Sequence, residues 1–420
     1  MCSSDLCAAL WVAWEMTQAR FLTGLPWNFL GASQSQMLPI IQIASITGVY
    51  GVSFLAAWFA VSLLGAAAVV VRRSQSPRRW LGELILPMLA IAAAVGYGLP
   101  RILQPVKPPD ARELDITLIQ PSIPQRWIWA PGESSNRFVQ LLQLSDQALA
   151  RRVAGTNRLG LIVWPEAAVP GLVRFDTNIH HAITNFVRRH NVWLVLGADD
   201  VAARRDSDNP FAYDNFNASF LISPDGKFRE TYRKRRLVLF GEYLPFARAL
   251  PSLERWTGMG SFTPGREVVP FRVPELGFNT SVLICFEDVF PHLVREYVDD
   301  DTDFLLNLTN NGWFGESAAQ WQHAANAAFR AIENGLPLVR CANNGITCLV
   351  TPQGAMRDIF LPGTTDAYGA GFKTVRVPLL NGQKRTPTYY RKHGDVFGWG
   401  CVAWSMLTIG RGCIRRRCQT

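Results

Sequence analysis

The sequence lacks the short motifs that bind nucleotides and metal ions. It contains no P-loop, no GxGxxG after a strand-like run and no HExxH. The six histidines are scattered, and no CxxC pair or Cys/His ligand spacing is present. Eight cysteines in 420 residues are also too few and too dispersed for a disulfide framework. We therefore expect neither a cofactor nor a metal ion.

One cysteine pair leaves an alternative open. Cys341 and Cys348 flank the turn NNGIT and would face each other if the runs on either side formed a hairpin. A disulfide between them is one alternative, and two free thiols are the other.

Long apolar runs are present, and they gather at the two ends of the chain. The run Ile46–Val71 carries no charge and exceeds the roughly 20 residues needed to cross the hydrocarbon core of a bilayer. A second run covers about 80–103, and a shorter third run covers 396–409. The opening stretch, Leu6–Phe21, is interrupted by charge and predicts a span, part of one, or an interfacial helix. These runs predict a chain anchored in a membrane.

The net charge of +9 is explained by membrane topology rather than by nucleic-acid binding. The basic residues cluster beside the apolar runs, at Arg72, Arg73, Arg78 and Arg79 and again at Arg411, Arg415, Arg416 and Arg417. If both clusters lie in the cytoplasm, the part of the chain between the second and third runs lies outside. We therefore expect an extracytoplasmic central domain and no nucleic-acid partner.

The central part of the chain alternates strand-like and helix-like segments. Apolar runs that predict strands lie at 114–121, 159–166, 191–198, 217–226, 279–287 and 302–310, with a further pair on either side of Asn343–Gly345. Helical patterns lie at Asn136–Val153, Thr177–His190 and Ala318–Asn334, and the last is followed by a C′ glycine, Gly335. Alternation of this kind predicts an α/β domain with covered sheets.

Two chemically useful side chains stand where predicted strands end. Glu166 follows LGLIVW and Cys285 follows SVLI, and ligands gather at the carboxyl ends of strands in α/β folds. Lys234 lies in a basic stretch between strands. A thiolate from Cys285, a base from Glu166 and an oxyanion contact from Lys234 would support acyl transfer without histidine. Their residue types also fit a buried cysteine, a turn glutamate and a solvated lysine, and the spacing does not decide between the two interpretations.

A resemblance favours the first interpretation. The segments WPEAAVP, YRKRRLVLFGEYLPF, VLICFEDVFP and LLNLTNNGWFGESAAQWQH closely resemble the nitrilase superfamily. More narrowly, with GLPWNFLGASQ, GVYGVSF and QPSIPQRWIWAPG, they resemble the apolipoprotein N-acyltransferases of bacterial lipoprotein maturation. The resemblance covers essentially all of residues 5–410. It implies a four-layer α-β-β-α sandwich domain flanked by transmembrane helices.

The resemblance also implies a role for individual residues. Glu166 corresponds to the general base, Lys234 to the oxyanion-stabilising lysine and Cys285 to the nucleophile. The remaining positions are supporting glutamates and side chains on the substrate side of the site: Glu242, Glu287, Trp129, Trp313 and Phe314.

The implied reaction moves a fatty acyl chain through a Cys285 thioester. The donor would be a membrane phospholipid, typically phosphatidylethanolamine, and the acceptor the N-terminal α-amine of a diacylated apolipoprotein. We expect a monomer in the bacterial inner membrane, with its catalytic domain on the periplasmic side. The expected division is a membrane region at 1–103, a catalytic domain at 104–392, and a C-terminal helix with a basic tail at 393–420.

Three alternatives remain open at this stage. One is a membrane-anchored carbon–nitrogen hydrolase or amidase that releases the acyl group to water. Another is a catalytically silent membrane scaffold. The third is an impaired fragment of the transferase, because the family resembled here carries more spans before its catalytic domain than this chain does. Position 286 is also phenylalanine where many relatives have tyrosine.

Overall fold

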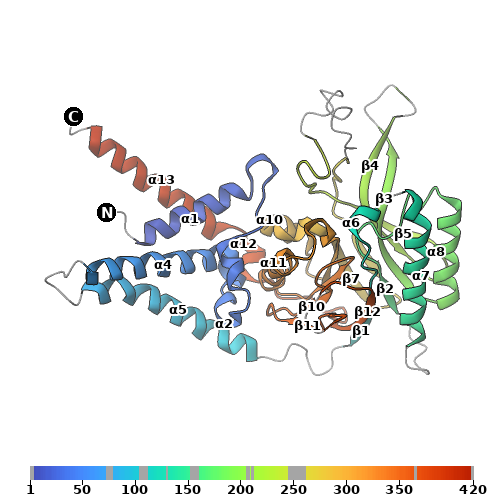
Figure 1. The fold of residues 1–420 in the computed structure, drawn as a ribbon. Coiled ribbons are helices and arrows are strands. Elements are labelled where there is room, and N and C mark those ends of the chain that lie inside the picture. Colours follow the sequence, from blue (N-terminus) through green and yellow to red (C-terminus); the bar gives the residue numbers. More distant parts are fainter. Residues whose placement is uncertain are drawn as a thin grey trace.

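The computed structural model describes residues 4–71, 79–103, 112–128, 131–151, 160–204, 209, 212–244, 262–363 and 367–417. Within these ranges a two-sheet domain carries a group of long helices on one side (Figure 1). The helices before the domain are α1 (Ser4–Gln18), α2 (Leu38–Ile41), α3 (Ala44–Thr47), α4 (Val49–Val71) and α5 (Arg79–Leu103). After the domain come α12 (Tyr389–His393) and α13 (Val396–Arg417).

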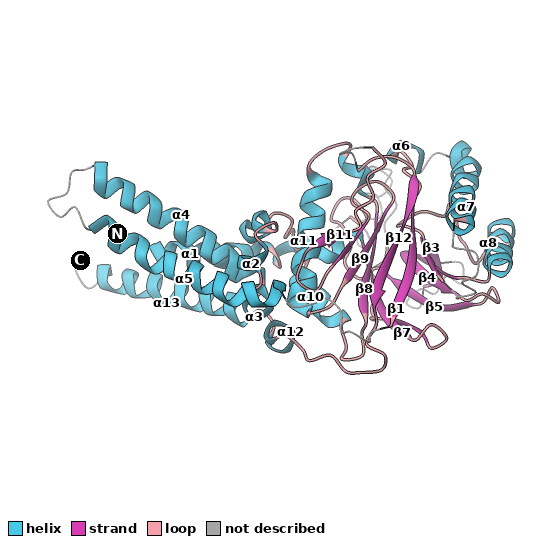
Figure 2. Cartoon of the chain, turned by 90° about the horizontal axis from the view of Figure 1, so that it is seen from below, coloured by secondary structure: helices cyan, strands magenta, loops and turns pink. Residues whose placement is uncertain are grey.

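The first sheet has the strand order β12-β1-β2-β3-β4-β5. Its strands are β1 (Glu113–Gln120), β2 (Leu161–Val163), β3 (Trp193–Ala203), β4 (Tyr213–Ile222), β5 (Phe228–Arg233) and β12 (Gly371–Pro378). The central strands β1, β2 and β3 are parallel, whereas the outer pairings are antiparallel. Helices α7 (Ser134–Ala150) and α8 (Thr177–His190) cover its outer face, and the short α6 (Gln125–Ile128) precedes them (Figure 2).

The second sheet has the order β11-β10-β9-β8-β7-β6. Its strands are β6 (Pro270–Val273), β7 (Phe278–Ile284), β8 (Phe304–Thr309), β9 (Leu338–Ala342), β10 (Cys348–Val350) and β11 (Met356–Arg357). Strands β7, β8 and β9 are parallel, and α10 (Pro291–Val294) and α11 (Ala319–Asn334) cover the outer face (Figure 2). Across the inner face, the Cys341 Sγ lies 3.3 Å from the carbonyl oxygen of Ile119 on β1. The predicted four-layer α-β-β-α sandwich is confirmed.

Most of the expected elements form where the sequence places them. Helix α8 has the predicted bounds because Asp176 caps its first turn and Asn191, in a left-handed conformation, ends it. Gly335 likewise ends α11 with φ 69°. Strand β3 continues to Ala203, five residues beyond the run expected at 191–198, because it pairs with β4 along its whole length.

The alternative of a disulfide between Cys341 and Cys348 is wrong, since both thiols are free and buried. The two strands do form an antiparallel pair, but in a register that sets Cys348 opposite Arg340. Because side chains alternate between the faces of a sheet, Cys341 and Cys348 point to opposite faces.

Two helices among the described residues are long and apolar enough to cross a membrane: Val49–Val71 and Leu81–Leu103 within α5. They lie side by side, and large apolar side chains project outward from them, including Leu63, Leu64 and Leu86. Such a surface is typical of helices that contact lipid. The third expected span falls within α13, which is not among these two helices and so stays a prediction.

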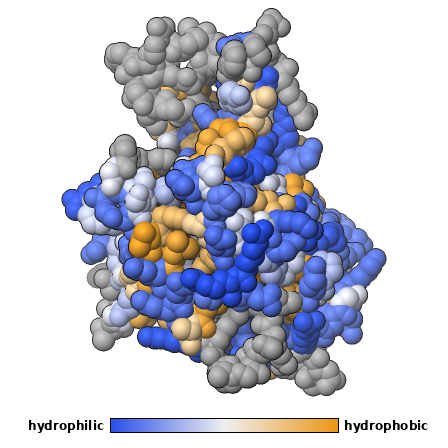
Figure 3. All heavy atoms as spheres, turned by 90° about the vertical axis from the view of Figure 1, so that its right-hand side faces the viewer, coloured by the Kyte–Doolittle hydropathy of each residue, from blue (hydrophilic) through white to orange (hydrophobic). Residues whose placement is uncertain are grey.

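The two ends of the molecule differ in polarity. The helices extend from one end of the sandwich, and the last described residues of α4 and α13 lie far from the sheets (Figures 1 and 2). The opposite end, built around α7 and α8, presents a mainly hydrophilic surface (Figure 3).

Candidate functional site

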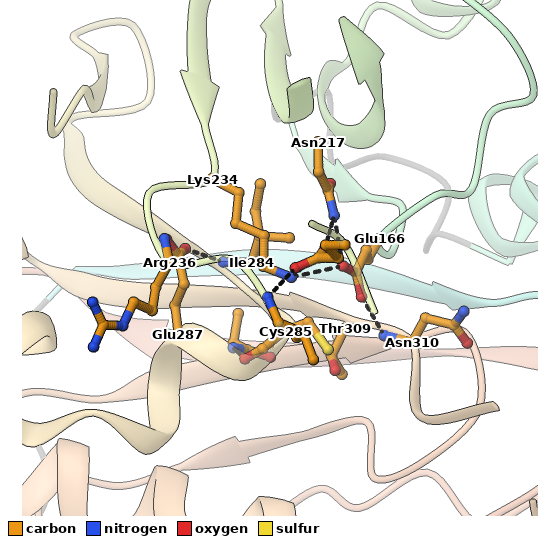
Figure 4. Close-up of polar contacts among 12 residues, drawn as sticks. Glu166, Asn217, Lys234, Arg236, Ile284, Cys285, Glu287, Thr309 and Asn310 are labelled. Atoms are coloured by element: carbon orange, nitrogen blue, oxygen red, sulfur yellow. Dashed lines mark hydrogen bonds and ion pairs between the residues drawn. The ribbon is translucent and has the colours of Figure 1, made fainter. Parts of the chain in front are cut away.

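The structure brings Glu166, Lys234 and Cys285 together at one edge of the two sheets (Figure 4). Glu166 follows β2, Lys234 follows β5, and Cys285 follows β7. The Lys234 Nζ lies 3.3 Å from the Glu166 Oε1 and 2.8 Å from the Glu242 Oε1. Their roles in catalysis stay predictions, but their convergence meets the geometric requirement for them.

The lysine is fully enclosed, and two carboxylates keep it charged. Burial on its own would lower the pKa of Lys234, but Glu242 and Glu166 outweigh that cost and hold the pKa above its usual range. An ammonium group fixed in this way is a permanent positive charge at the site. It can stabilise an oxyanion without first gathering a proton.

The backbone of Cys285 adopts a strained conformation in a turn. Its φ is 51°, a left-handed conformation that is uncommon for residues other than glycine. The residue ends β7 and begins the short 3-10 helix η4 (Cys285–Val289). The side chain of Asn307, on the neighbouring strand β8, donates to the Cys285 carbonyl at 3.1 Å. This turn directs the thiol out of the sheet toward Thr309 and Glu166 (Figure 4).

The thiol is held in its neutral form. Burial and then the negative charge of Glu166 raise the pKa of Cys285 to about 12, while Lys234, the Thr309 hydroxyl and the Asn310 N–H act in the opposite direction. A thiolate is therefore not stored at this site. It has to be generated by proton transfer when a substrate is attacked.

Glu166 is positioned by contacts to both carboxylate oxygens. The Asn217 side chain donates to Oε1 at 2.9 Å, and the Asn310 N–H donates to Oε2 at 3.0 Å. The adjacent strand β3 leaves room for the loop of Glu166 because it has a glycine, Gly197, at the point of contact. A Cβ on Gly197 would lie 2.6 Å from the Pro165 carbonyl oxygen and 2.8 Å from the Glu166 Cα. Glycine is therefore required at position 197 for this approach.

The two predicted supporting glutamates fix the loops that carry the lysine and the thiol. Glu242 accepts from the Val238 N–H at 2.8 Å as well as from Lys234. Glu287, fully buried, accepts from the Ile284 N–H at 2.8 Å and from the Arg235 N–H at 2.8 Å. Glu287 thus joins the turn of Cys285 to the segment that follows Lys234.

The remaining predicted residues are less tightly placed. Trp129 lies outside the described residues. Trp313 and Phe314 belong to the 3-10 helix η6 (Asn311–Phe314) and are 56% and 43% exposed. The Phe314 ring lies 5.0 Å from the ring of Trp27, which comes from the segment before α2.

Several residues near the site were not singled out from the sequence. Asn217 donates to both Glu166 and Glu242. An asparagine inside an apolar strand is a signal that could have identified it. Asp199 pairs with Asn217 across β3 and β4. Burial and then repulsion from Glu166 and Glu242 raise the pKa of its carboxyl to about 6. No local pattern in the sequence marks Asp199 as a residue near the site.

His323, a buried residue on α11, connects the short helices η4 and η6, which lie beside the thiol. His323 lies 2.7 Å from Asp288 in η4 through Nε2 and 2.9 Å from the Asn311 side-chain oxygen in η6 through Nδ1. Arg340 forms an ion pair with the other oxygen of Asp288. Burial would raise the pKa of Asp288, but His323 and Arg340 hold it below its usual range.

Comparison with known families matches two parts of the chain. Residues 116–358 match the carbon–nitrogen hydrolase family, and residues 4–62 match the apolipoprotein N-acyltransferase N-terminal domain. These two matches cover most of the sandwich domain and the start of the helical region.

Two relatives agree with these family matches. The chain is 34% identical to the apolipoprotein N-acyltransferase of Geobacter metallireducens over 395 residues, which is 94% of this chain and 71% of that protein. It is 33% identical to the Vibrio cholerae apolipoprotein N-acyltransferase over 84% of this chain and 66% of that protein. A solved mutant amidase of the nitrilase superfamily from Nesterenkonia superposes with a TM-score of 0.45 at 16% identity, covering 69% of this chain and 97% of the amidase.

Proposed function

Because this chain belongs to the apolipoprotein N-acyltransferase family, we propose that Cys285 takes a fatty acyl chain from a membrane phospholipid and passes it to a lipoprotein amine. The acceptor is the N-terminal α-amine of a diacylglyceryl-cysteine. The observation that carries the proposal is the convergence of Cys285, Glu166 and Lys234 in one enclosed site.

In the first half-reaction, Glu166 removes the proton of the Cys285 thiol as the sulfur attacks the ester carbonyl carbon. The carbonyl oxygen gains negative charge, which the Lys234 ammonium stabilises. The carbon–oxygen ester bond then breaks, and Glu166 returns the proton to the departing lysophospholipid oxygen. The acyl chain is left on sulfur as a thioester.

In the second half-reaction, the amine of the lipoprotein attacks the thioester carbonyl. Glu166 accepts the proton of the attacking amine while Lys234 again faces the oxyanion. The carbon–sulfur bond then breaks, and the Cys285 thiolate leaves and recovers that proton from Glu166. Two bulky lipid substrates use one pocket in turn, so the site never has to hold both. Phosphatidylethanolamine fits the donor role as a phospholipid with an ester-linked chain.

The placement of the helices supports a membrane topology. The last described residues of α4 and α13 lie at the same end of the molecule, away from the sandwich (Figure 1). The basic residues at 72–79 and 411–417 follow those two helices in the sequence. We place both clusters in the cytoplasm, consistent with the positive-inside tendency. The sandwich at 104–392 then lies on the periplasmic side of the inner membrane, between helical regions at 1–103 and 393–420.

Intact-mass measurement of the detergent-purified protein incubated with phospholipid tests the proposal. We expect a mass increase of one acyl chain that hydroxylamine removes, and no increase in Cys285→Ala. The matched control Cys348→Ala removes a different free thiol, which is buried, and this variant should still be acylated. Addition of a diacylated lipopeptide should discharge the adduct to an N-acyl product.

Two results would contradict this proposal. An acyl adduct in Cys285→Ala would assign the nucleophile elsewhere. Free fatty acid without N-acyl product in the presence of the lipopeptide would favour the hydrolase alternative.

A further inference from the structure

His323 is a fully buried histidine that takes no part in the reaction steps above. Its Nε2 lies 2.7 Å from the Asp288 Oδ1 in η4, the turn that begins with Cys285. Its Nδ1 lies 2.9 Å from the Asn311 Oδ1 in η6. A carboxylate oxygen and an amide oxygen only accept hydrogen bonds, so both ring nitrogens donate. One side chain therefore holds both segments beside the nucleophile.

The surroundings of His323 keep its ring in place. Asp288, which is also fully buried, forms an ion pair with Arg340 in addition to its contact with the ring. The ring packs against Trp27 with centroids 5.0 Å apart. Trp27 belongs to the junction between the helical region and the sandwich, where its carbonyl accepts from the Asn326 side chain on α11 at 2.9 Å. The ring is thus held by η4 and η6 through its nitrogens and by Trp27 through packing.

The contact between His323 and Asn311 leads on to the sulfur through Thr309. The buried Thr309 hydroxyl donates to the same Asn311 Oδ1 at 3.1 Å. It also faces the Cys285 sulfur (Figure 4). Burial raises the pKa of the Cys285 thiol, and a hydrogen bond with the Thr309 hydroxyl is among the contacts that lower it. The Asn311 oxygen therefore has two donors, and the Thr309 hydroxyl has two possible acceptors.

A hydroxyl has one proton to donate, and this limit gives His323 its importance. While the thiol is neutral, Thr309 directs its proton to Asn311. When the thiolate forms, its charge favours turning that proton toward sulfur, because hydrogen bonds to charged groups are the stronger ones. The turn leaves Asn311 with His323 as a donor. Without His323, the same turn would leave a buried amide oxygen without a partner, which costs free energy.

We propose that His323 is a positioning residue for the thiolate of Cys285. By donating to Asn311, it leaves the Thr309 hydroxyl free to donate to the sulfur as the proton departs. Its contact with Asp288 keeps the turn of Cys285 aligned with η6. This proposal rests on the proposed function, which makes Cys285 the nucleophile, and adds a group that assists formation of the thiolate.

Alkylation of Cys285 by iodoacetamide at pH 8 tests the proposal and does not require acyl transfer. The rate is measured by peptide mapping of the full-length protein in detergent. His323→Phe keeps a ring beside Trp27 but removes both donors. His323→Asn places an amide N–H near the position of Nδ1 and keeps the contact with Asn311. His323→Gln places it near the position of Nε2 and keeps the contact with Asp288.

We expect alkylation to be about three- to tenfold slower in His323→Phe and in His323→Gln, and His323→Asn to recover most of the wild-type rate. Thr309→Val should slow alkylation by a similar factor. The double variant Thr309→Val/His323→Phe should be no slower than Thr309→Val alone, because both changes act through one hydroxyl. The control His181→Phe, at an exposed position of α8, should keep the wild-type rate.

Equal rates in His323→Asn and His323→Gln, or losses that multiply in the double variant, would overturn the proposal. Thermal midpoints identify a variant that fails to fold, and if His323→Phe is one, the comparison of His323→Asn with His323→Gln decides. Failure of the proposed function is a separate result. If no acyl adduct forms on the wild type but the alkylation pattern holds, the transfer reaction is wrong and the positioning role of His323 stands.

Discussion

At the scale of single residues, the central feature is a thiol that stays protonated beside the carboxylate proposed as its base. Glu166 raises the pKa of Cys285 through its negative charge, and it is also the group proposed to accept the proton. The two effects of one carboxylate are therefore opposed. It lowers the amount of free thiolate, yet it makes proton transfer possible during attack.

The substitution Glu166→Gln separates the effect of Glu166 on the thiol pKa from its proposed role in proton transfer. Loss of the negative charge lowers the pKa of Cys285, so we expect faster alkylation by iodoacetamide at pH 8 than in the wild type, by roughly two- to tenfold. Acyl transfer from phospholipid should fall by about 100-fold or more because the base is lost. In the wild type, alkylation should keep rising with pH beyond pH 9, toward the thiol pKa of about 12.

Peptide mapping after timed alkylation measures the rate at Cys285. The control is Glu275→Gln, an exposed glutamate, which should change neither quantity. Slower alkylation in Glu166→Gln would show that Glu166 assists even simple thiol chemistry and would contradict the electrostatic explanation.

At the scale of elements, the site depends on a close approach between the backbone of strand β3 and the backbone of the loop that carries Glu166. Strand β3 passes under the loop of Glu166 at Gly197, and no side chain fits between them. We expect Gly197→Ala to displace this loop and lower acyl transfer by about tenfold to 100-fold, since small misplacements of catalytic groups have effects of this size.

The matched control for this prediction is Gly363→Ala. A Cβ at Gly363 would meet nothing within 4 Å, so the same substitution there should leave acyl transfer unchanged. Measurement of adduct formation and of the thermal midpoint for both variants separates loss of position from loss of folding. Full transfer activity in Gly197→Ala would mean that the loop adapts and that Glu166 needs no fixed support from β3.

The sequence predicts some elements much better than others. Strands β1, β7 and β8 were predictable because each contains a short buried apolar run, LI in β1, VLI in β7 and FLL in β8. Strands β5 and β12 were missed because polar side chains alternate along them, as in FRETYR and GFKTVRVP. The pairing of β9 with β10 was predicted, but not the register that keeps Cys341 and Cys348 apart.

The candidate site shows the same division. Glu166 and Cys285 could be selected because each ends an apolar strand. Their contact with Lys234, Asn217 and Asp199 depends on how two sheets stack, and no local pattern in the sequence encodes that distance. The resemblance to the family, and not the spacing of the residues, predicted that Glu166, Lys234 and Cys285 share one site.

At the scale of the whole molecule, polar contacts with little exposure join the N- and C-terminal helices to each other and to the sandwich. Arg20, after α1, pairs with Asp395, before α13, and the Tyr390 hydroxyl donates to the same carboxylate at 2.6 Å. The backbone N–H of Val49 at the start of α4 donates to the Glu333 Oε1 on α11 at 2.9 Å. These contacts hold the long helices in a defined position on the domain.

We expect Arg20→Ala to weaken the contact between the segment after α1 and the segment before α13. The Asp395 side chain is only 5% exposed, so loss of its cation leaves a nearly buried carboxylate without charge compensation. The expected loss of stability is about 1 to 3 kcal/mol, less than for a fully buried pair because Arg20 is 27% exposed. Thermal unfolding in detergent, followed by tryptophan fluorescence, measures the shift.

The control is Arg272→Ala, which removes the exposed ion pair with Asp301. Exposed pairs contribute about 0 to 1 kcal/mol, so its unfolding temperature should stay close to that of the wild type. Equal shifts in the two variants would show that the Arg20–Asp395 pair has no special role at the junction. The double variant Arg20→Ala/Asp395→Asn should recover part of the loss, because the uncompensated charge is gone.

The anchoring of Trp27 to α11 has a consequence for how the protein is made. The contact between Trp27 and Asn326 joins positions 299 residues apart, and that between Arg20 and Asp395 joins positions 375 apart. Ribosomes extend a chain by about 5 to 20 residues each second, so the early segment waits tens of seconds for its partners. During that time Trp27 and its apolar neighbours have no native surface to cover. The junction therefore forms last, and it is the stage at which a newly made chain most needs protection from aggregation or proteolysis.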